Sequence, residues 1–139
     1  MTTYTVSSGH TSSGITLNPG DTMTVRNGGT AVDTTDAGFQ DVFGKTIGTV
    51  INNGTEWVES GGVASGTILN GNGAEFVVGV GATVSGAVFN DNSDTYLEGA
   101  ITVIGSVINS GSLVDVSFGG TTTGSIINNG GAEYVEYQG

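Results

Sequence analysis

Apolar residues recur along the chain in short runs that are separated by Gly and Asn. One kind of run ends in an apolar pair, such as Val50-Ile51 or Ile68-Leu69, and an Asn follows the pair directly. A second kind surrounds a Val, as in residues 56–59. Runs of this length are typical of strands, and no segment shows the 3.6-residue period of a helix. The pattern therefore predicts an all-β protein whose strands are too short to be stable as isolated hairpins.

Three columns of similar residues repeat in phase over the whole chain. The first column is an Asn-x-Gly anchor or a near variant, at Asn18, Asp36, Asn52, Asn70, Asn90, Asn109 and Asn128. The second column holds Val6, Val25, Val42, Val58, Val77, Leu97, Val116 and Val135. The third is a Gly four residues before each anchor, with Val32 as the exception. A unit of ~19 residues with Gly and Asn at its corners predicts a β-solenoid of about seven rungs.

Each column of a solenoid stacks on itself, so the repeat also predicts which residues face inward. The residue before each anchor is expected inside, which gives Leu17, Thr35, Ile51, Leu69, Phe89, Ile108 and Ile127. The residue two before the anchor is expected outside, as a lateral contact strip of Val50, Ile68, Val88, Val107 and Ile126. The asparagines are expected to form a stacked amide ladder. Residues 1–139 are predicted to be a single solenoid domain with a half-unit at 1–10 and a degenerate rung at 30–45.

The unit at residues 55–70 resembles a known kind of repeat. Its Trp57-Val58 strand, its Gly61-Gly62 corner and its Asn70 anchor are similar to the strand-loop-strand repeats of autotransporter passenger domains, the AIDA-type repeats of self-associating bacterial adhesins. This resemblance covers essentially the whole chain. It implies a right-handed parallel β-helix at the bacterial cell surface or outside the cell, with a role in adhesion, aggregation or a biofilm matrix. It also implies candidate O-glycosylation at Ser60, and less well at Ser8 and Ser117.

The composition excludes several classes of protein. The chain has 26 Gly but one Pro, no Cys and a single His, so collagen, a disulfide scaffold and a thiolate metal site are excluded. The net charge is -11, and Arg26 and Lys45 are the only basic residues. Nucleic acid and anionic membranes are therefore not expected partners. No apolar stretch is long enough to be inserted in a membrane, and no secretion signal is visible at the start.

Aromatic residues mark one face of the predicted rod. Trp57, Phe76 and Tyr96 are expected in one column on three successive rungs, with Tyr134 two rungs later. Period-2 alternation would point these rings outward, with Glu59 and Glu98 beside them. This face is a candidate for contacts with glycans or with a second copy. The alternative is an aromatic stack that packs on itself or lies beneath a neighbouring chain.

The acidic residues give no sign of an active site. Glu56, Glu75 and Glu133 are expected to share one exposed column, and Glu59, Glu98 and Glu136 another. Acid–base catalysis needs two carboxylates in different environments that face one cleft, so we expect no enzyme. No cofactor is expected either, with weak calcium binding at Asp33, Asp36 and Asp41 as the alternative.

The sequence thus favours a non-enzymatic, extracellular structural or adhesive module. It would act as a rigid rod that presents its repeated columns of side chains to a partner. The expected partner is a second copy, bound end to end or laterally, or a surface glycan. End-to-end contact is expected because the last rung closes at residues 137–139 without a polar cap, unless the array continues. The alternative function is a carbohydrate-binding or carbohydrate-active β-helix that uses the Trp57 face.

Overall fold

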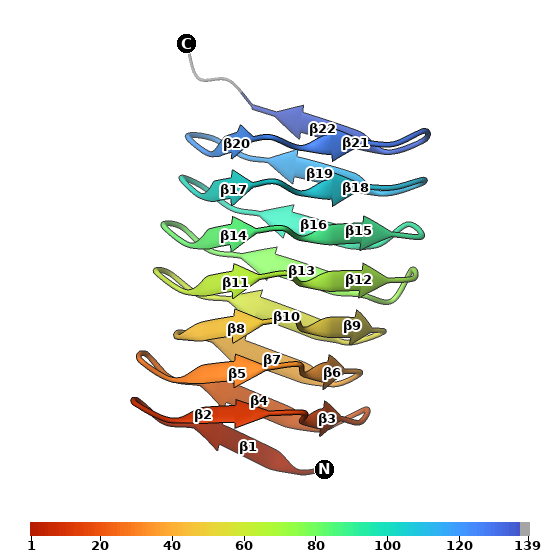
Figure 1. The fold of residues 1–139 in the computed structure, drawn as a ribbon. Helices are drawn as coiled ribbons and strands as arrows, with labels where there is room; N and C mark the ends of the chain where they lie inside the picture. The colour runs from red at the N-terminus through yellow and green to blue at the C-terminus, as the bar shows by residue number, and fades with distance from the viewer. Residues whose placement is uncertain (137–139) are drawn as a thin grey trace.

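The protein is an all-β parallel β-solenoid of about seven rungs with a repeat of ~19 residues, as the sequence predicts (Figure 1). The computed structural model describes residues 1–136, apart from the side chain of Asp94. The predicted closure of the last rung, at residues 137–139, lies outside the described residues. Among the described residues no helix could span a membrane.

In residues 1–136, twenty-two short strands form three parallel sheets, and each rung adds one strand to each sheet. Sheet A contains β1 (Thr3–Val6), β4 (Thr22–Val25), β7 (Phe39–Val42), β10 (Thr55–Val58), β13 (Glu75–Val78), β16 (Asp94–Leu97), β19 (Leu113–Val116) and β22 (Ala132–Val135). Sheet B contains β2 (Thr11–Ser13), β5 (Thr30–Val32), β8 (Lys45–Ile47), β11 (Val63–Ser65), β14 (Thr83–Ser85), β17 (Thr102–Ile104) and β20 (Thr121–Thr123). Sheet C contains β3 (Thr16–Leu17), β6 (Thr35–Asp36), β9 (Val50–Asn52), β12 (Ile68–Asn70), β15 (Val88–Asn90), β18 (Val107–Ile108) and β21 (Ile126–Ile127).

Sheets B and C lie in line along one side of the rod, and sheet A returns along the other side (Figure 1). The chain bends between sheets B and C at the predicted Gly column. The backbone there has a positive φ of 63–72° at Gly14, Gly48, Gly66, Gly86, Gly105 and Gly124. L-residues with a Cβ rarely adopt this conformation, which explains why the column is glycine.

The degenerate rung at 30–45 departs from the predicted register by one residue. Asp33, not Val32, takes the bend position, with a φ of 52°. Asp36 pairs with Leu17 and Ile51, so its side chain is inside the rod. The prediction that Thr35 faces inward is therefore wrong, since Thr35 is exposed. The cause is a short connection to sheet A, of Ala37 and Gly38 only, which moves the anchor position to Ala37.

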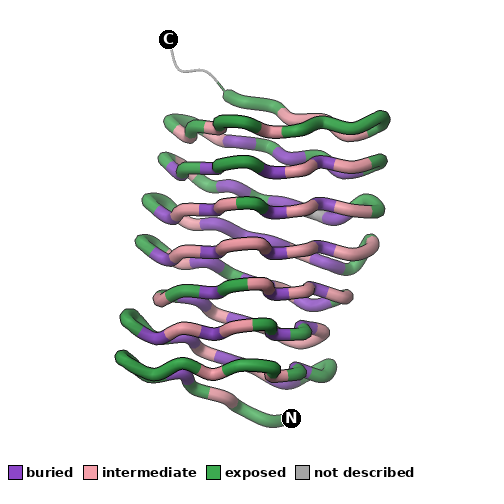
Figure 2. Tube along the Cα trace, in the orientation of Figure 1, coloured by how far each residue is buried: buried purple, intermediate pink, exposed green. Residues whose placement is uncertain are grey.

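The buried side chains run through the centre of the rod, and the corners are exposed (Figure 2). The predicted Val column is confirmed as buried over most of its length, with one correction. Val78 rather than Val77 is in register with Val58 and Leu97. The apolar core forms two clusters. The smaller contains Val6, Leu17, Met23, Val25, Ala31 and Val42. The larger begins at Ile51 and ends at Val116.

The predicted amide ladder is confirmed along one edge of sheet C. The side-chain amides of Asn70, Asn90, Asn109 and Asn128 each donate to the asparagine of the preceding rung at 2.6–3.1 Å, and Asn52 is the first acceptor. Asn18 is outside the ladder and bonds Asp21 instead. The apolar strip beside it also faces outward as predicted. Val50, Ile68, Val88 and Val107 are half-buried there, and Ile126 is exposed.

Candidate functional site

The aromatic face of sheet A exists, but its register differs from the prediction at one position. Trp57 pairs with Val77, and Val77 pairs with Tyr96. Phe76 instead pairs with Glu56 and is fully buried, so the prediction that Phe76 belongs to the exposed face is wrong. The connection from β12 to β13 holds residues 71–74, whereas only residues 53 and 54 join β9 to β10. This turn is longer by two residues, whereas the prediction that aligned Trp57 with Phe76 allowed for one, so the predicted register is wrong by one residue. An error of one residue exchanges the two faces of a strand.

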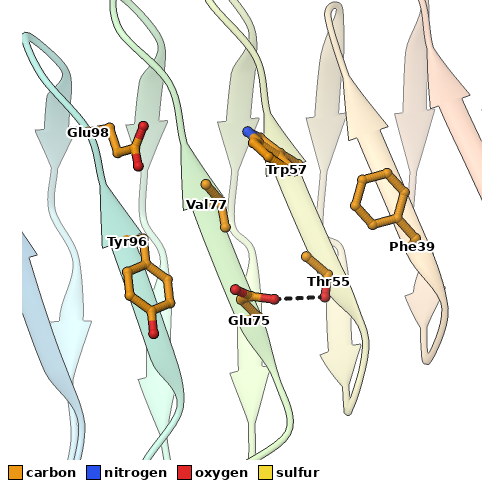
Figure 3. A pocket seen from close by; sticks show the side chains of 7 residues that line it. All are labelled: Phe39, Thr55, Trp57, Glu75, Val77, Tyr96 and Glu98. Atoms are coloured by element: carbon orange, nitrogen blue, oxygen red, sulfur yellow. Dashed lines mark hydrogen bonds between the residues drawn. The ribbon is translucent and has the colours of Figure 1, made fainter.

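A groove of about 390 Å³ crosses the outer face of four neighbouring strands of sheet A, β7, β10, β13 and β16 (Figure 3). Its lining consists of Phe39, Thr55, Trp57, Glu75, Val77, Tyr96 and Glu98. The predicted residues Trp57, Tyr96 and Glu98 therefore meet at one place.

The rings of Trp57 and Tyr96 stand on either side of Val77 (Figure 3). Trp57 is 42% exposed and Tyr96 is 54% exposed, whereas Val77 is only 9% exposed and forms the floor. Phe39 contacts Trp57 edge to face, with ring centroids 6.4 Å apart and an interplanar angle of 75°. This contact fixes the indole on one side of the groove, because edge-to-face packing is a favoured aromatic geometry.

The groove is negatively charged. Glu75 and Glu98 line it, and the Thr55 hydroxyl donates a hydrogen bond of 3.2 Å to Glu75 Oε2. Asp41 and Glu59 lie beside it, and burial together with the charge of Glu59 raises the pKa of Asp41. The one ion pair found among the described residues joins the amino terminus to Asp21, so the groove carboxylates have no cationic partner within the described chain.

The remaining predicted face residues lie outside the groove. Glu59 follows β10 and is half-buried, and Tyr134 is 63% exposed on β22, next to Asp115 of β19. Sequence reasoning missed Phe39, Thr55, Glu75 and Val77, which complete the lining. Their only signal is a position on the first or third residue of a strand of sheet A, and this could not be assigned before the turn lengths were known.

The prediction that Glu56 lies in an exposed column is wrong. Glu56 is fully buried and accepts hydrogen bonds from the hydroxyls of Thr46 (2.7 Å), Thr49 (3.3 Å) and Thr67 (2.9 Å). Burial raises the pKa of Glu56 to about 7, against the bonds from these hydroxyls, which lower it. Glu133 shares this inner column and accepts hydrogen bonds from Thr122 and Ser125. Glu75, which the sequence places with them, points to the outer groove.

The three aspartates of the degenerate rung do not converge. Asp33 is at the bend between sheets B and C, Asp36 is inside the rod and Asp41 is on the outer side of sheet A. Burial raises the pKa of Asp36 to about 6, although the backbone N–H of Gly38 donates to its carboxylate at 2.8 Å. Within residues 1–136, no group of three or more His, Cys, Asp or Glu side chains could hold a metal ion.

Ser60, the candidate for O-glycosylation, is exposed at the corner that follows β10. Ser8 occupies the same corner of an earlier rung and is also exposed, and Ser117 is half-buried. The accessibility of Ser60 is compatible with a modification, which stays a prediction.

The fold and its repeated columns define a parallel β-solenoid repeat protein. No family model matches the chain, and no curated protein sequence matches it. Among solved structures, it is similar to the TibC-catalysed hyper-glycosylated TibA55-350 fragment, with a TM-score of 0.87 and 31% sequence identity. The match covers 96% of this chain and 50% of that one, so the chain spans about half the length of the structure it matches. It shows a related β-solenoid fold over nearly the whole chain.

Proposed function

We propose that the protein is a non-enzymatic structural or adhesive module of the bacterial cell surface or the extracellular space, which acts by associating with copies of itself. The resemblance to AIDA-type repeats and the likeness to the glycosylated TibA fragment support this class. The absence of catalytic function is supported by the position of the two carboxylates with strongly raised pKa values. Asp36 and Glu56 are both closed off from solvent, where no substrate could reach them.

The observation that carries the proposal is the apolar strip along the outer face of sheet C. Five aliphatic side chains lie in register on successive rungs, at Val50, Ile68, Val88, Val107 and Ile126. The asparagine ladder runs beside them. A row of apolar side chains with a polar border suits lateral contact between two rods, because association removes the row from water.

The test is the mass of the particle in solution as protein concentration rises, by analytical ultracentrifugation or light scattering. The double substitution Ile68→Lys and Val107→Lys places charge on the strip and is expected to abolish association. Thr83→Lys with Thr102→Lys is the matched control, since these residues face outward from sheet B. A strictly monomeric parent protein, or equal association of both double variants, would contradict the proposal.

The groove favours a second candidate function, the binding of a saccharide. The exposed rings of Trp57 and Tyr96, one on each side of Val77, are suited to stacking on the apolar face of a sugar ring. Thr55 and Glu75 supply groups that can form hydrogen bonds with sugar hydroxyls. Trp57 is the only tryptophan of the chain, so its fluorescence reports on the groove alone. A change in this signal on addition of a saccharide, lost in Tyr96→Ala, is the result expected of this candidate.

A further inference from the structure

The negative charge of the groove indicates which class of saccharide it binds. This inference rests on the second candidate function, the binding of a saccharide in the groove. We propose that the groove around Val77 binds a cationic saccharide, a polymer of amino sugars whose ammonium groups lie between the two aromatic rings and the two carboxylates. The ligand class follows from the residues that meet at Val77 and from the charge along sheet A.

The first argument is the spacing of the rings. Trp57 and Tyr96 are on the strands that flank Val77, and neighbouring strands lie about 4.8 Å apart. A group bound above Val77 is thus within about 6 Å of both rings, which is the range over which an aromatic face attracts a cation. The same rings and the Val77 floor offer apolar surface to the C–H face of a sugar.

The second argument is the placement of the carboxylates. Glu75 is two residues before Val77 on β13, and Glu98 follows Tyr96 by two residues at the other end of the groove (Figure 3). Neither carboxylate has a cationic partner among the described residues. The groove therefore offers one carboxylate to an ammonium group at each end, with the two rings between them, whereas a uronic acid or a phosphate would be repelled.

The third argument is the extent of the charge. Acidic side chains continue along the same outer side of sheet A, at Asp41, Glu59, Glu75, Glu98, Asp115 and Glu136. Of the two basic residues, Lys45 lies on sheet B, away from this side, and Arg26 follows β4, outside the groove at the amino-terminal end of the acidic row. A ligand with one positive charge per repeating unit matches this row better than a single cation does, which favours a polymer.

The test is a fluorescence titration of Trp57 with a chitosan hexamer at mildly acidic pH, where its amines are charged. The fully acetylated chitin hexamer is the neutral counterpart, and oligolysine of equal charge is the peptide counterpart. We expect the chitosan hexamer to bind with an affinity that falls as salt rises, and both counterparts to bind at least about tenfold more weakly.

Variants separate the two parts of the site. Tyr96→Ala is expected to weaken binding about tenfold, and Glu98→Gln to weaken it several-fold and to reduce the salt dependence. Tyr134→Ala is the matched control for the ring, because Tyr134 occupies the same column on β22 but has Asp115 rather than Val77 as its neighbour. This substitution should leave the affinity unchanged.

Three outcomes would overturn the inference. Equal or tighter binding of the chitin hexamer would leave a saccharide site without a preference for cations. Equal binding of oligolysine, unaffected by Tyr96→Ala, would mean a non-specific acidic surface. No binding of either saccharide would remove the second candidate function as well. Self-association through sheet C is measured separately and is unaffected by any of these results.

Discussion

The interior of the rod differs sharply between its second and third rungs and the rungs that follow. Residues 30–58 place a polar layer inside, composed of Thr34, Asp36, Gln40, Thr46, Thr49 and Glu56. Residues 63–116 bury mainly apolar side chains, the largest of which are Leu69, Phe76, Phe89, Leu97, Ile101 and Ile108. The two apolar clusters of the core are separated at this polar layer.

One inner column of sheet A shows the contrast directly. Gln40, Glu56 and Phe76 are neighbours in register, so an amide, a carboxyl group and a phenyl ring occupy equivalent positions on successive rungs. Three hydroxyls bond Glu56, but both amide atoms of Gln40 are buried without a hydrogen-bond partner. A solenoid tolerates such exchange because each rung contacts only its neighbours, and backbone ladders hold the rung whatever its interior contains.

The largest effect is expected from a cavity in the apolar part. Phe89 is fully buried and packs against Phe76 with ring centroids 6.3 Å apart. Phe89→Ala should lower the free energy of unfolding by about 3–5 kcal/mol, because the rigid rungs cannot close the space. Urea denaturation followed by circular dichroism measures this. A loss below about 1 kcal/mol would show that the rungs relax around the cavity.

The polar layer should make stability depend on pH. The pKa of Glu56 rises from 4.5 to about 7 on folding, and that of Asp36 from 3.8 to about 6. The folded protein therefore keeps protons that the unfolded chain releases, so this contribution is full below the ordinary pKa and is lost as pH rises through about 7. Glu56 alone accounts for about 3 kcal/mol between these limits.

Urea denaturation at a series of pH values measures this dependence, with Glu56→Gln as the control. The variant keeps an acceptor for the three hydroxyls and has no proton to lose, so its profile should be much flatter. Stability that rises with pH over this range in the parent protein would contradict the assignment.

A smaller effect, of opposite sign, is expected from removing the amide inside the polar layer. Gln40→Met places a side chain there that the neighbouring rung already accepts at Met23. The free energy of unfolding should increase by about 1 kcal/mol, because two polar atoms without partners are removed. Thermal denaturation detects this change, and a lower melting temperature would show that the amide is hydrogen-bonded in solution.

The smallest expected effect concerns the edge that both regions share. Asn90 donates to Asn70 and accepts from Asn109, whereas Asn128 of the last rung donates to Asn109. Asn90→Ala should cost about 0.5–1 kcal/mol and Asn128→Ala about half as much, measured by urea denaturation. An equal loss of stability in both variants would mean that the free energy of unfolding does not depend on the number of ladder hydrogen bonds removed.

The comparison also explains which parts of the structure could be predicted from the sequence. The bends between sheets B and C were predictable because a positive φ favours glycine, so a glycine such as Gly48 or Gly66 recurs in the sequence at a regular interval. Phe76 was misplaced because the turn before it is long, and Asp36 because the turn after it is short; similar short motifs align equally well one residue apart. The hydrogen bonds to Glu56 come from threonines in or beside sheets B and C, so no local sequence pattern predicts them.

The groove was only half predictable for the same reason. Trp57, Tyr96 and Glu98 could be found as a repeated aromatic and acidic pattern, and the structure brings them together. Phe39 lies in the degenerate rung, where the repeat is hardest to follow. The contact of Phe39 with Trp57 depends on the register of β7 against β10, which is set by the connection of Ala37 and Gly38.

The asparagine ladder gives the rod an electrical direction. Every side-chain amide in it donates toward the amino-terminal end, so the amide dipoles point the same way from Asn128 to Asn52. Aligned dipoles add, as they do along an α-helix, and the two ends of this edge carry opposite partial charge. Two rods that contact each other side by side along this edge bring their dipoles into opposition when they run antiparallel, which is the favourable arrangement, so the ladder favours antiparallel over parallel lateral contact.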